Sequence, residues 1–302
     1  MTSTDNPIVL AFSGGLDTSF CVPWLAETYG RPVVTATVNT GGLDADASRA
    51  LADKAMKLGA VDHVEIDARA EFFDTVIRYL IAGNVRRGNL YPLCVGAERG
   101  VQARHLAQAA VARGSTTVAH GCTAAGNDQV RFEIVLKALA PDLEVLAPVR
   151  DNAFQRDEQI RYLTEHDMPL PSAGSAYSIN RGLWGVTIGG TETLDSAGSI
   201  PESAWVLSPG ALESGAAKTN VEIGFAEGVP VSLDGRTLDP VALIEALETL
   251  GARYGIGRGI HLGDTVLGTK GRVAFEAPAA EILLDAHREL EKLTLGKEQA
   301  RF

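Results

Sequence analysis

The sequence predicts an α/β fold in which a Rossmann-like parallel sheet is followed by a smaller α+β region. Three observations lead to this prediction. Five short β-rich runs alternate with helical patterns over the first 150 residues, a glycine-rich turn follows the first run, and the composition changes near Met168. Alternation of strands and helices is typical of a parallel sheet covered by helices on both faces.

The elements of the first half follow from local patterns. Short apolar runs that end in turn residues predict strands at residues 8–12, 32–38, 61–66, 117–120 and 143–147. Apolar residues at helical spacing predict helices at residues 17–28, 47–58, 70–81, 98–113, 128–139 and 157–166. Asp17 lies in the first turn of the first helix, and a loop is expected over residues 83–97.

The second half has a different composition and hydrophobic pattern. We therefore place a domain boundary near residue 168, which gives domains at 1–168 and 169–302. Residues 171–219 are rich in Gly, Ser, Thr and Pro and show little helical periodicity. Beyond them the pattern predicts strands at 221–225, 229–233, 261–267 and 272–276, an Asp-Gly turn at 234–235, and helices at 240–250 and 279–293. This mixture is typical of an α+β domain.

Composition and charge exclude several classes of protein. The net charge of −11 (27 basic against 38 acidic residues) opposes binding to the phosphate backbone of nucleic acids. No apolar run is long enough to span a membrane, and the N-terminus lacks the basic region of a signal peptide. Three cysteines without a CxxC pair and six scattered histidines argue against a disulfide scaffold and against a metal held by side chains. We expect a cytoplasmic protein that acts on small molecules.

The loop Ser13–Ser19 is the first candidate site. It follows a buried strand directly and enters a helix, so that its backbone N–H groups, its hydroxyls and the helix dipole all favour an anion there. The P-loop spacing and its lysine are absent. A Gly-Gly turn before a helix is equally compatible with a purely structural turn.

A second loop, from His120 to Asp128, also lies between a strand and a helix. Asn127, Asp128 and Arg131 would surround the first helical turn, where such groups can bind the ammonium and carboxylate of an amino acid. The alternative is a helix cap with a surface ion pair. Cys122 could act as a nucleophile, but we favour a small packing residue, and we interpret His120 as structural.

These motifs resemble a known family. The string SGGLDTS resembles the pyrophosphate-binding loop of the N-type ATP pyrophosphatases. Together with HGCTxxGNDQVRFE, Pro-Val-Arg at 148–150, YSIN at 177–180 with Leu-Trp at 183–184, and GTKGR at 268–272 with Glu-Ala-Pro at 276–278, it occurs in the order and spacing of the argininosuccinate synthase family. The resemblance implies a nucleotide-binding domain of the ATP pyrophosphatase type, followed by a synthetase domain.

The resemblance also implies a reaction. The family is an AMP-forming ligase of amino-acid biosynthesis: the ureido oxygen of citrulline attacks ATP and releases pyrophosphate, and the amine of L-aspartate then displaces AMP. ATP and Mg²⁺ are the implied cofactors. L-aspartate and citrulline, or a related carbonyl acceptor, are the implied substrates.

Roles carry over residue by residue from the matching motifs, with Asp17, Asp128 and Arg131 as the implied catalytic residues. The pyrophosphate end of ATP would contact Ser13, Gly14, Gly15, Asp17, Thr18 and Ser19, and the adenosine would contact Ala11, Ala36 and Gly121. Aspartate would contact Thr123, Asn127 and Asp128. The citrulline-type acceptor would contact Tyr91, Arg99, Arg131, Ser178 and Thr187.

The chain departs from the family pattern mainly around the acceptor. Val95, Gly96, Gly263 and Phe275 stand where the family has Thr, Ser, Glu and Tyr, and Ala125 replaces a lysine. An unpaired buried ammonium is strongly disfavoured, so these changes suggest an acceptor without the α-ammonium of citrulline. The alternative is drift compensated locally by Asn180, Arg181 or Asp264.

Other functions remain open at this stage. An inactive nucleotide-binding homologue would suit the missing polar groups, although both loops are retained. A tRNA-modifying member of the superfamily would need a basic surface. The chain ends before the family's C-terminal segment, which favours a homodimer over the family tetramer. Lys270 and Arg272 could reach a phosphate or carboxylate, or lie in a solvated turn.

Overall fold

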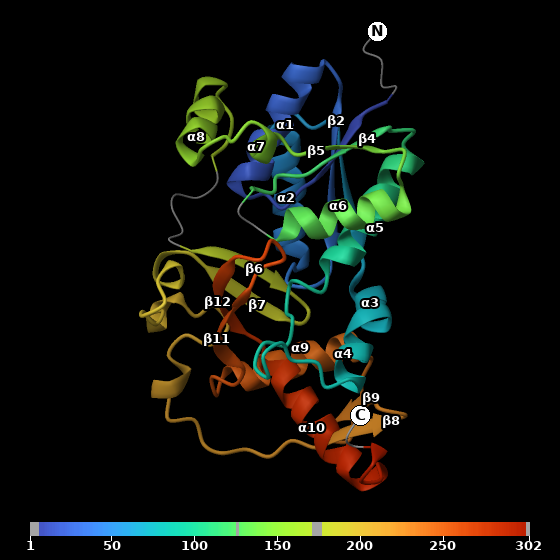
Figure 1. Cartoon of the computed structure of the whole chain (residues 1–302), viewed down its shortest axis with the longest axis vertical. Coiled ribbons are helices and arrows are strands. Elements are labelled where there is room, and N and C mark those ends of the chain that lie inside the picture. The colour runs from blue at the N-terminus through green and yellow to red at the C-terminus, as the bar shows by residue number, and fades with distance from the viewer. Residues whose placement is uncertain (1–5, 125–126, 171–176, 300–302) are drawn as a thin grey trace. The chain divides into compact units, whose positions relative to one another are not determined.

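The computed structural model describes residues 6–124, 127–170 and 177–299 (Figure 1). The chain divides into two compact units: unit 1 comprises Met1–Ala68 and Arg99–Ser175, and unit 2 comprises Arg69–Glu98 and Ala176–Phe302. The predicted single boundary near residue 168 differs from this division, because the segment Arg69–Glu98 of the first half packs with the C-terminal part.

Unit 1 is built on a parallel sheet of five strands in the order β3-β2-β1-β4-β5. The strands are β1 (Ile8–Ala11), β2 (Val33–Asn39), β3 (Asp62–Asp67), β4 (Thr117–Ala119) and β5 (Glu144–Leu146). All five predicted strands and their parallel arrangement are confirmed. The order reverses between β1 and β4, and ligands bind open α/β sheets outside the carboxyl ends of the strands at such a reversal.

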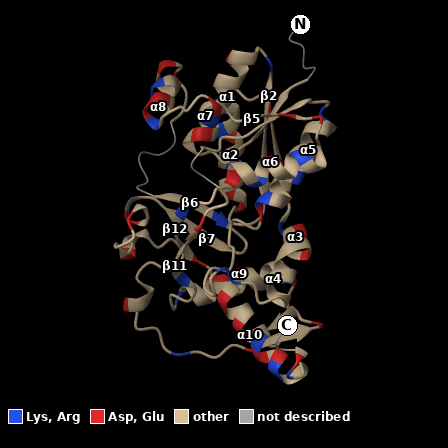
Figure 2. Ribbon diagram, viewed as in Figure 1, with Lys and Arg blue, Asp and Glu red and all other residues tan. Residues whose placement is uncertain are grey.

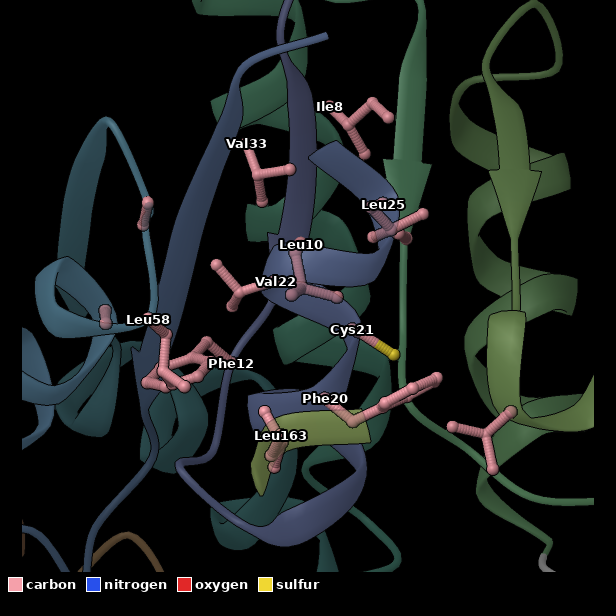
Figure 3. Close-up of a cluster of buried hydrophobic side chains, with 14 of the residues drawn as sticks. Ile8, Leu10, Phe12, Phe20, Cys21, Val22, Leu25, Val33, Leu58 and Leu163 are labelled. Atoms are coloured by element: carbon pink, nitrogen blue, oxygen red, sulfur yellow. The ribbon is translucent and has the colours of Figure 1, made fainter. Parts of the chain in front are cut away.

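Helices cover both faces of this sheet (Figure 1). They are α1 (Leu16–Tyr29), α2 (Ala45–Lys57), α5 (Arg99–Ala112), α6 (Asp128–Leu139), the short α7 (Pro148–Asp151) and α8 (Arg156–Glu165). Ile8 and Leu10 of β1 pack in one apolar cluster with α1 and α8 (Figure 3), whereas Val9 packs in a second cluster with α5 and α6. Successive side chains of a strand point to opposite faces, so a strand covered on both sides has to be apolar throughout.

Unit 2 contains two antiparallel sheets, which confirms the α+β expectation for the second half. The larger sheet has the order β11-β12-β7-β6, and the smaller one has the order β10-β9-β8. The strands are β6 (Ser178–Gly182), β7 (Gly185–Gly189), β8 (Ile223–Ala226), β9 (Val229–Leu233), β10 (Arg236–Thr237), β11 (Arg258–Asp264) and β12 (Lys270–Glu276). The helices are α3 (Arg69–Phe72), a π-helical turn (Phe73–Ile77), α4 (Arg78–Ala82), α9 (Pro240–Ala252) and α10 (Pro278–Thr294).

Three local differences from the expectation have physical reasons. The hairpin of β6 and β7 was not predicted, because β7 is buried along most of its length and shows no alternation. The turn between β11 and β12 lies at residues 265–269, earlier than expected, because Thr265 and Thr269 pair through their backbone and hydroxyl groups. The helix predicted at 70–81 contains one wide π-helical turn.

The surface carries both signs of charge despite the net charge of −11. Figure 2 shows acidic and basic residues mixed along α8 and α10. Among the described residues, no helix is both long and apolar enough to cross a membrane.

Candidate active-site loops

The first loop leads from β1 into α1 without a side-chain cap. Gly15 is the N-cap residue and makes no side-chain hydrogen bond, so the N–H groups of the first turn are left uncapped by a side chain. Thr18 Oγ1 lies 3.2 Å from Ser13 Oγ and donates to the Gly15 carbonyl at 3.3 Å. The buried Ser19 hydroxyl donates to the Gly14 carbonyl at 3.3 Å. The hydroxyls of Ser13, Thr18 and Ser19 thus hold the loop together through contacts within it.

Glycine is required here by space as well as by conformation. Gly14 has φ +72°, and a Cβ there would lie 2.4 Å from Leu51 Cδ1 on α2. A Cβ on Gly121 would lie 3.0 Å from Thr18 Cγ2 and 3.1 Å from Thr18 N. The backbone of the second loop therefore lies against the first turn of α1, and the structure brings the two loops together at the reversal of strand order. This arrangement fits a phosphate group bound by main-chain amides.

Asp17 is turned toward α8. Burial raises the pKa of the Asp17 carboxyl, while a hydrogen bond from Gln159 and the charge of Arg156 oppose the shift. Gln159 is almost fully buried. Gln159 could not be found from the motifs, because no local pattern links it to a residue more than a hundred positions away in the sequence.

The two alanines expected near the adenosine are neighbours in the sheet. Ala11 of β1 is paired with Ala36 of β2, and the Phe12 amide donates to the Ala36 carbonyl at 2.9 Å. Ala11 ends β1, whereas Ala36 lies in the middle of β2 and is buried in the core. Their role beside the adenosine stays a prediction.

In the second loop, Asp128 bridges two arginines. Its Oδ2 lies 3.0 Å from Arg99 Nε, and its Oδ1 accepts from Arg131 Nη1 at 2.9 Å. Arg99 begins α5, whereas Asp128 and Arg131 belong to the first turn of α6. Thr123 is exposed, Asn127 is half-buried and precedes α6, and Ala125 lies outside the described residues. The structure thus gathers Arg99, Asp128 and Arg131 into one charged cluster.

A network of polar side chains holds this loop in place. Arg150 contacts the Glu133 carboxylate and donates to Gln129 Oε1 at 3.2 Å, and Gln129 in turn donates to the Ala124 carbonyl at 2.6 Å. These contacts explain physically why Pro-Val-Arg and the Gln and Glu of the second motif occur together. Arg150 ties the loop to α7.

The environments of His120 and Cys122 agree with structural roles. Burial, reinforced by the charge of Arg150, lowers the pKa of His120 to about 4, so the ring is neutral at pH 7. Its Nδ1 accepts from the Cys122 amide at 3.3 Å. Burial raises the pKa of Cys122 to about 12, which keeps the sulfur protonated and poorly nucleophilic.

Two of the residues expected to contact the acceptor, Ser178 and Thr187, lie on the larger sheet of unit 2, whereas Arg99 and Arg131 belong to unit 1. Thr187 is directly opposite Phe275 on one side and Asn180 on the other, and directly opposite residues of an antiparallel sheet point to the same face. Residues an even number of positions apart in a strand point to the same face. Ser178 is two positions from Asn180, and Gly263 is four positions from Gly259, which pairs with Phe275. By this register, Ser178, Thr187, Gly263 and Phe275 belong to one face, which we call the acceptor face.

Segment Tyr91–Glu98 covers the acceptor face. The Tyr91 ring stacks on His261 at 5.4 Å and contacts the Phe275 ring at 5.1 Å between centroids. Its hydroxyl donates to the Cys94 carbonyl. Val95 is buried and has φ +60°, and Gly96 follows it in the same turn. Of the departures from the family pattern, Val95 and Phe275 are thus buried apolar residues, and Gly263 lies near the end of β11.

Of the three residues considered as local compensation, Asn180 lies on the acceptor face opposite Thr187, and the other two are engaged elsewhere. Arg181 pairs with Glu248 at 2.9 Å, and Asp264 pairs with Lys270 at 2.5 Å. Arg272 donates to the backbone carbonyls of Glu192, Asp195 and Gly198, which gives it a structural role. Lys270 lies exposed in its ion pair with Asp264.

Comparison with known proteins agrees with this geometry. Residues 7–169 match the model of the arginosuccinate synthase N-terminal HUP domain, and residues 177–302 match that of the C-terminal domain. The chain is similar to the argininosuccinate synthase of Dictyoglomus turgidum, with 41% identity over 98% of this chain and 73% of that protein. It is also similar to that of Lactococcus lactis subsp. cremoris, with 38% identity over 99% of this chain and 75% of that protein. With both loops at the reversal of strand order and both family models matched along nearly its whole length, the chain belongs to the argininosuccinate synthase family.

Proposed function

We propose that this chain is an AMP-forming ligase that joins L-aspartate to citrulline. The observation that carries the proposal is the glycine-built loop at the N-terminus of α1, against which Gly121 of the second loop lies. The relatives are named argininosuccinate synthase, and none of those names supports an altered acceptor or an inactive homologue.

The proposed reaction has two steps. The ureido oxygen of citrulline forms a bond to the α-phosphorus of ATP, and the bond to pyrophosphate breaks. The amine of aspartate then attacks the activated carbon, loses a proton and expels AMP. Neither step needs a covalent protein nucleophile, so positioning and charge stabilisation supply the catalysis.

The first loop would stabilise the leaving pyrophosphate. The uncapped amides of the first turn of α1, the Gly14–Gly15 backbone and the dipole of α1 all favour negative charge there. Mg²⁺ would arrive bound to the nucleotide and neutralise phosphate charge. Such an ion takes mainly phosphate and water oxygens, and therefore needs no dedicated cluster of protein ligands.

The second loop would hold aspartate. Thr123, Asn127 and the carboxylate of Asp128 offer partners for its ammonium and carboxylate groups. Arg99 and Arg131 place two positive charges beside Asp128. A pair of guanidinium groups is suited to orient substrate carboxylates through bidentate hydrogen bonds.

We place citrulline at the acceptor face, with Tyr91, Ser178 and Thr187 as its expected contacts. The buried apolar side chains of Val95 and Phe275 supply no polar atoms for the α-ammonium group. Hydrogen-bonding sites lose affinity steeply when partners are removed, so we expect a raised KM for citrulline rather than a lost reaction.

The test measures pyrophosphate release from ATP and Mg²⁺ with aspartate present and citrulline present or omitted, and identifies products by mass spectrometry. We expect AMP, pyrophosphate and the mass of argininosuccinate only when both amino acids are present. If citrulline is inert but ureido or amide acids without the α-amino group release pyrophosphate, the ligase chemistry stands and the acceptor is wrong. Silence with every acceptor would overturn the proposal.

A further inference from the structure

Lys54 on α2 contacts the backbone of the first loop. Its ammonium group donates to the Gly14 carbonyl, forty positions away in sequence. Leu51, one turn earlier on α2, occupies the space in which a Gly14 side chain would lie. Partial burial lowers the pKa of Lys54. Two residues on one face of α2 thus meet the same glycine, and the sequence motifs assigned neither of them a role.

The contact constrains the peptide that follows. In a planar trans peptide, the carbonyl of residue 14 and the N–H of residue 15 point in opposite directions. The Gly14 carbonyl is held on one side by Lys54 Nζ and the Ser19 hydroxyl. The Gly15 N–H therefore points away from these two groups. Because two successive glycines offer little resistance to a flip of this peptide, its orientation depends on partners such as these.

We propose that Lys54 is a positioning residue of the phosphate loop. By holding the Gly14 carbonyl, it keeps the Gly15 N–H available to the pyrophosphate end of a nucleoside triphosphate. Lys54 acts through the loop backbone and does not itself touch the ligand. The inference rests on the proposed function for the identity of the ligand, but not for the reaction.

The experiment measures binding of inorganic pyrophosphate and of ATP to the full chain by calorimetry, without aspartate or acceptor. Lys54→Met should weaken binding of both ligands about 10-fold, the loss expected if the Gly14–Gly15 peptide then presents the Gly15 N–H only about a tenth of the time. Lys54→Arg should recover most of the affinity. Lys57→Met removes an exposed lysine from the last turn of the same helix and should change nothing.

A double-mutant cycle tests the route through the Gly14 carbonyl. Ser19→Ala removes the other side-chain donor to this carbonyl, so the effects of Ser19→Ala and Lys54→Met on pyrophosphate affinity should be non-additive. Additive effects, or wild-type affinity in Lys54→Met, would overturn the inference. If Lys54→Met does not fold, Lys54→Gln is measured in the same cycle.

Kinetics separate this inference from the proposed function. In an active enzyme, Lys54→Met should raise the KM for ATP and leave the KM for aspartate unchanged, and an equal rise in both would contradict a role confined to the phosphate loop. If the wild-type chain binds ATP but forms no product with any acceptor, the proposed function fails, while the binding experiment still decides the role of Lys54.

Discussion

The two loops of unit 1 and the acceptor face of unit 2 are built in different ways. The loops present main-chain amides. Glycines allow their shape, because a side chain at Gly14 or Gly121 would come too close to neighbouring atoms. The acceptor face instead presents side chains from β6, β7, β11 and β12. A substitution on such a face changes which chemical groups are presented without changing the backbone. A site made of backbone groups therefore keeps a recognisable sequence motif. A site made of side chains can change its chemistry while the fold stays the same.

The supports of the two regions differ as well. Polar contacts from Arg150 and Lys54 hold the loops of unit 1. In unit 2 the rings of Tyr91, His261 and Phe275 pack on the acceptor face, and the opposite face belongs to an apolar cluster with Val186 and Ile188. The first region should respond most to changes in backbone conformation and charge, and the second to side-chain size and polarity.

The largest effect is expected from Gly14→Ala. The added Cβ would lie 2.4 Å from Leu51 Cδ1 in a backbone conformation with φ +72°, so the end of the Leu51 side chain or the loop backbone has to shift. Loss of aligned amide donors should lower kcat/KM for ATP about 100-fold or more. Gly30→Ala is the matched control, since Gly30 has φ +60° but no atom within 4 Å of the added group. Steady-state kinetics should show Gly30→Ala near wild type, and similar losses in both variants would contradict the steric argument.

The next effect is expected in unit 2 from Glu276→Gln. The fully buried Glu276 carboxylate accepts from the amides of Val206, Leu207 and Ser208 and from the Ser208 hydroxyl. An amide replaces one acceptor oxygen with a donor that faces other donors. We expect a loss of roughly 2–4 kcal/mol in unfolding free energy, measured by denaturant titration.

The affinity for pyrophosphate shows whether this variant also affects unit 1. It should stay at the wild-type value in Glu276→Gln, because this carboxylate belongs to unit 2 and bonds to Val206, Leu207 and Ser208, not to the loops of unit 1. Glu222→Gln, an exposed change in the same unit, should alter neither quantity. Equal losses of stability from both glutamates would show that the buried contacts contribute little.

Acid should destabilise unit 1 through His120. Its folded-state pKa is about 4 against an ordinary value of 6.5, so the unfolded chain binds the proton first as the pH falls. The contribution to stability is full above pH 6.5 and is lost between 6.5 and 4, amounting to about 2 kcal/mol by pH 5. Glu133, Asp151 and Arg150 face this ring, and the two acids oppose the shift. Unfolding followed against pH should be flatter in His120→Gln, and an unchanged slope would count against the buried neutral ring.

The smallest effect is expected from Phe275→Tyr. The added hydroxyl restores one polar atom to the acceptor face, so the KM for citrulline should fall about 2- to 5-fold. Phe225→Tyr, on β8 of the smaller sheet, should leave the KM unchanged. A rise in KM would show that the Phe275 ring, packed over Gly259 and against Tyr91, has no room for the hydroxyl.

Much of unit 1 could be predicted from the sequence, because its signals are local. Strand, glycine turn and helix follow one another within residues 8–29, and His120–Arg131 repeats the arrangement. The acceptor residues could be named only through family motifs. Tyr91, Thr187 and Phe275 come together by strand pairing and by the packing of a distant segment, which no periodicity encodes.

The sequence by itself determined the parallel sheet and the two strand-to-helix loops, and the family motifs located the positions where the acceptor residues depart from the family. Only the tertiary structure decided that Arg69–Glu98 packs with unit 2, that β6 and β7 form a hairpin on the larger sheet, and that Lys54 holds the Gly14 carbonyl. The physical reason is the range of the interactions. Hydrophobic period and turn chemistry act over a few neighbouring residues, whereas these features rest on contacts between segments that only the folded chain brings together.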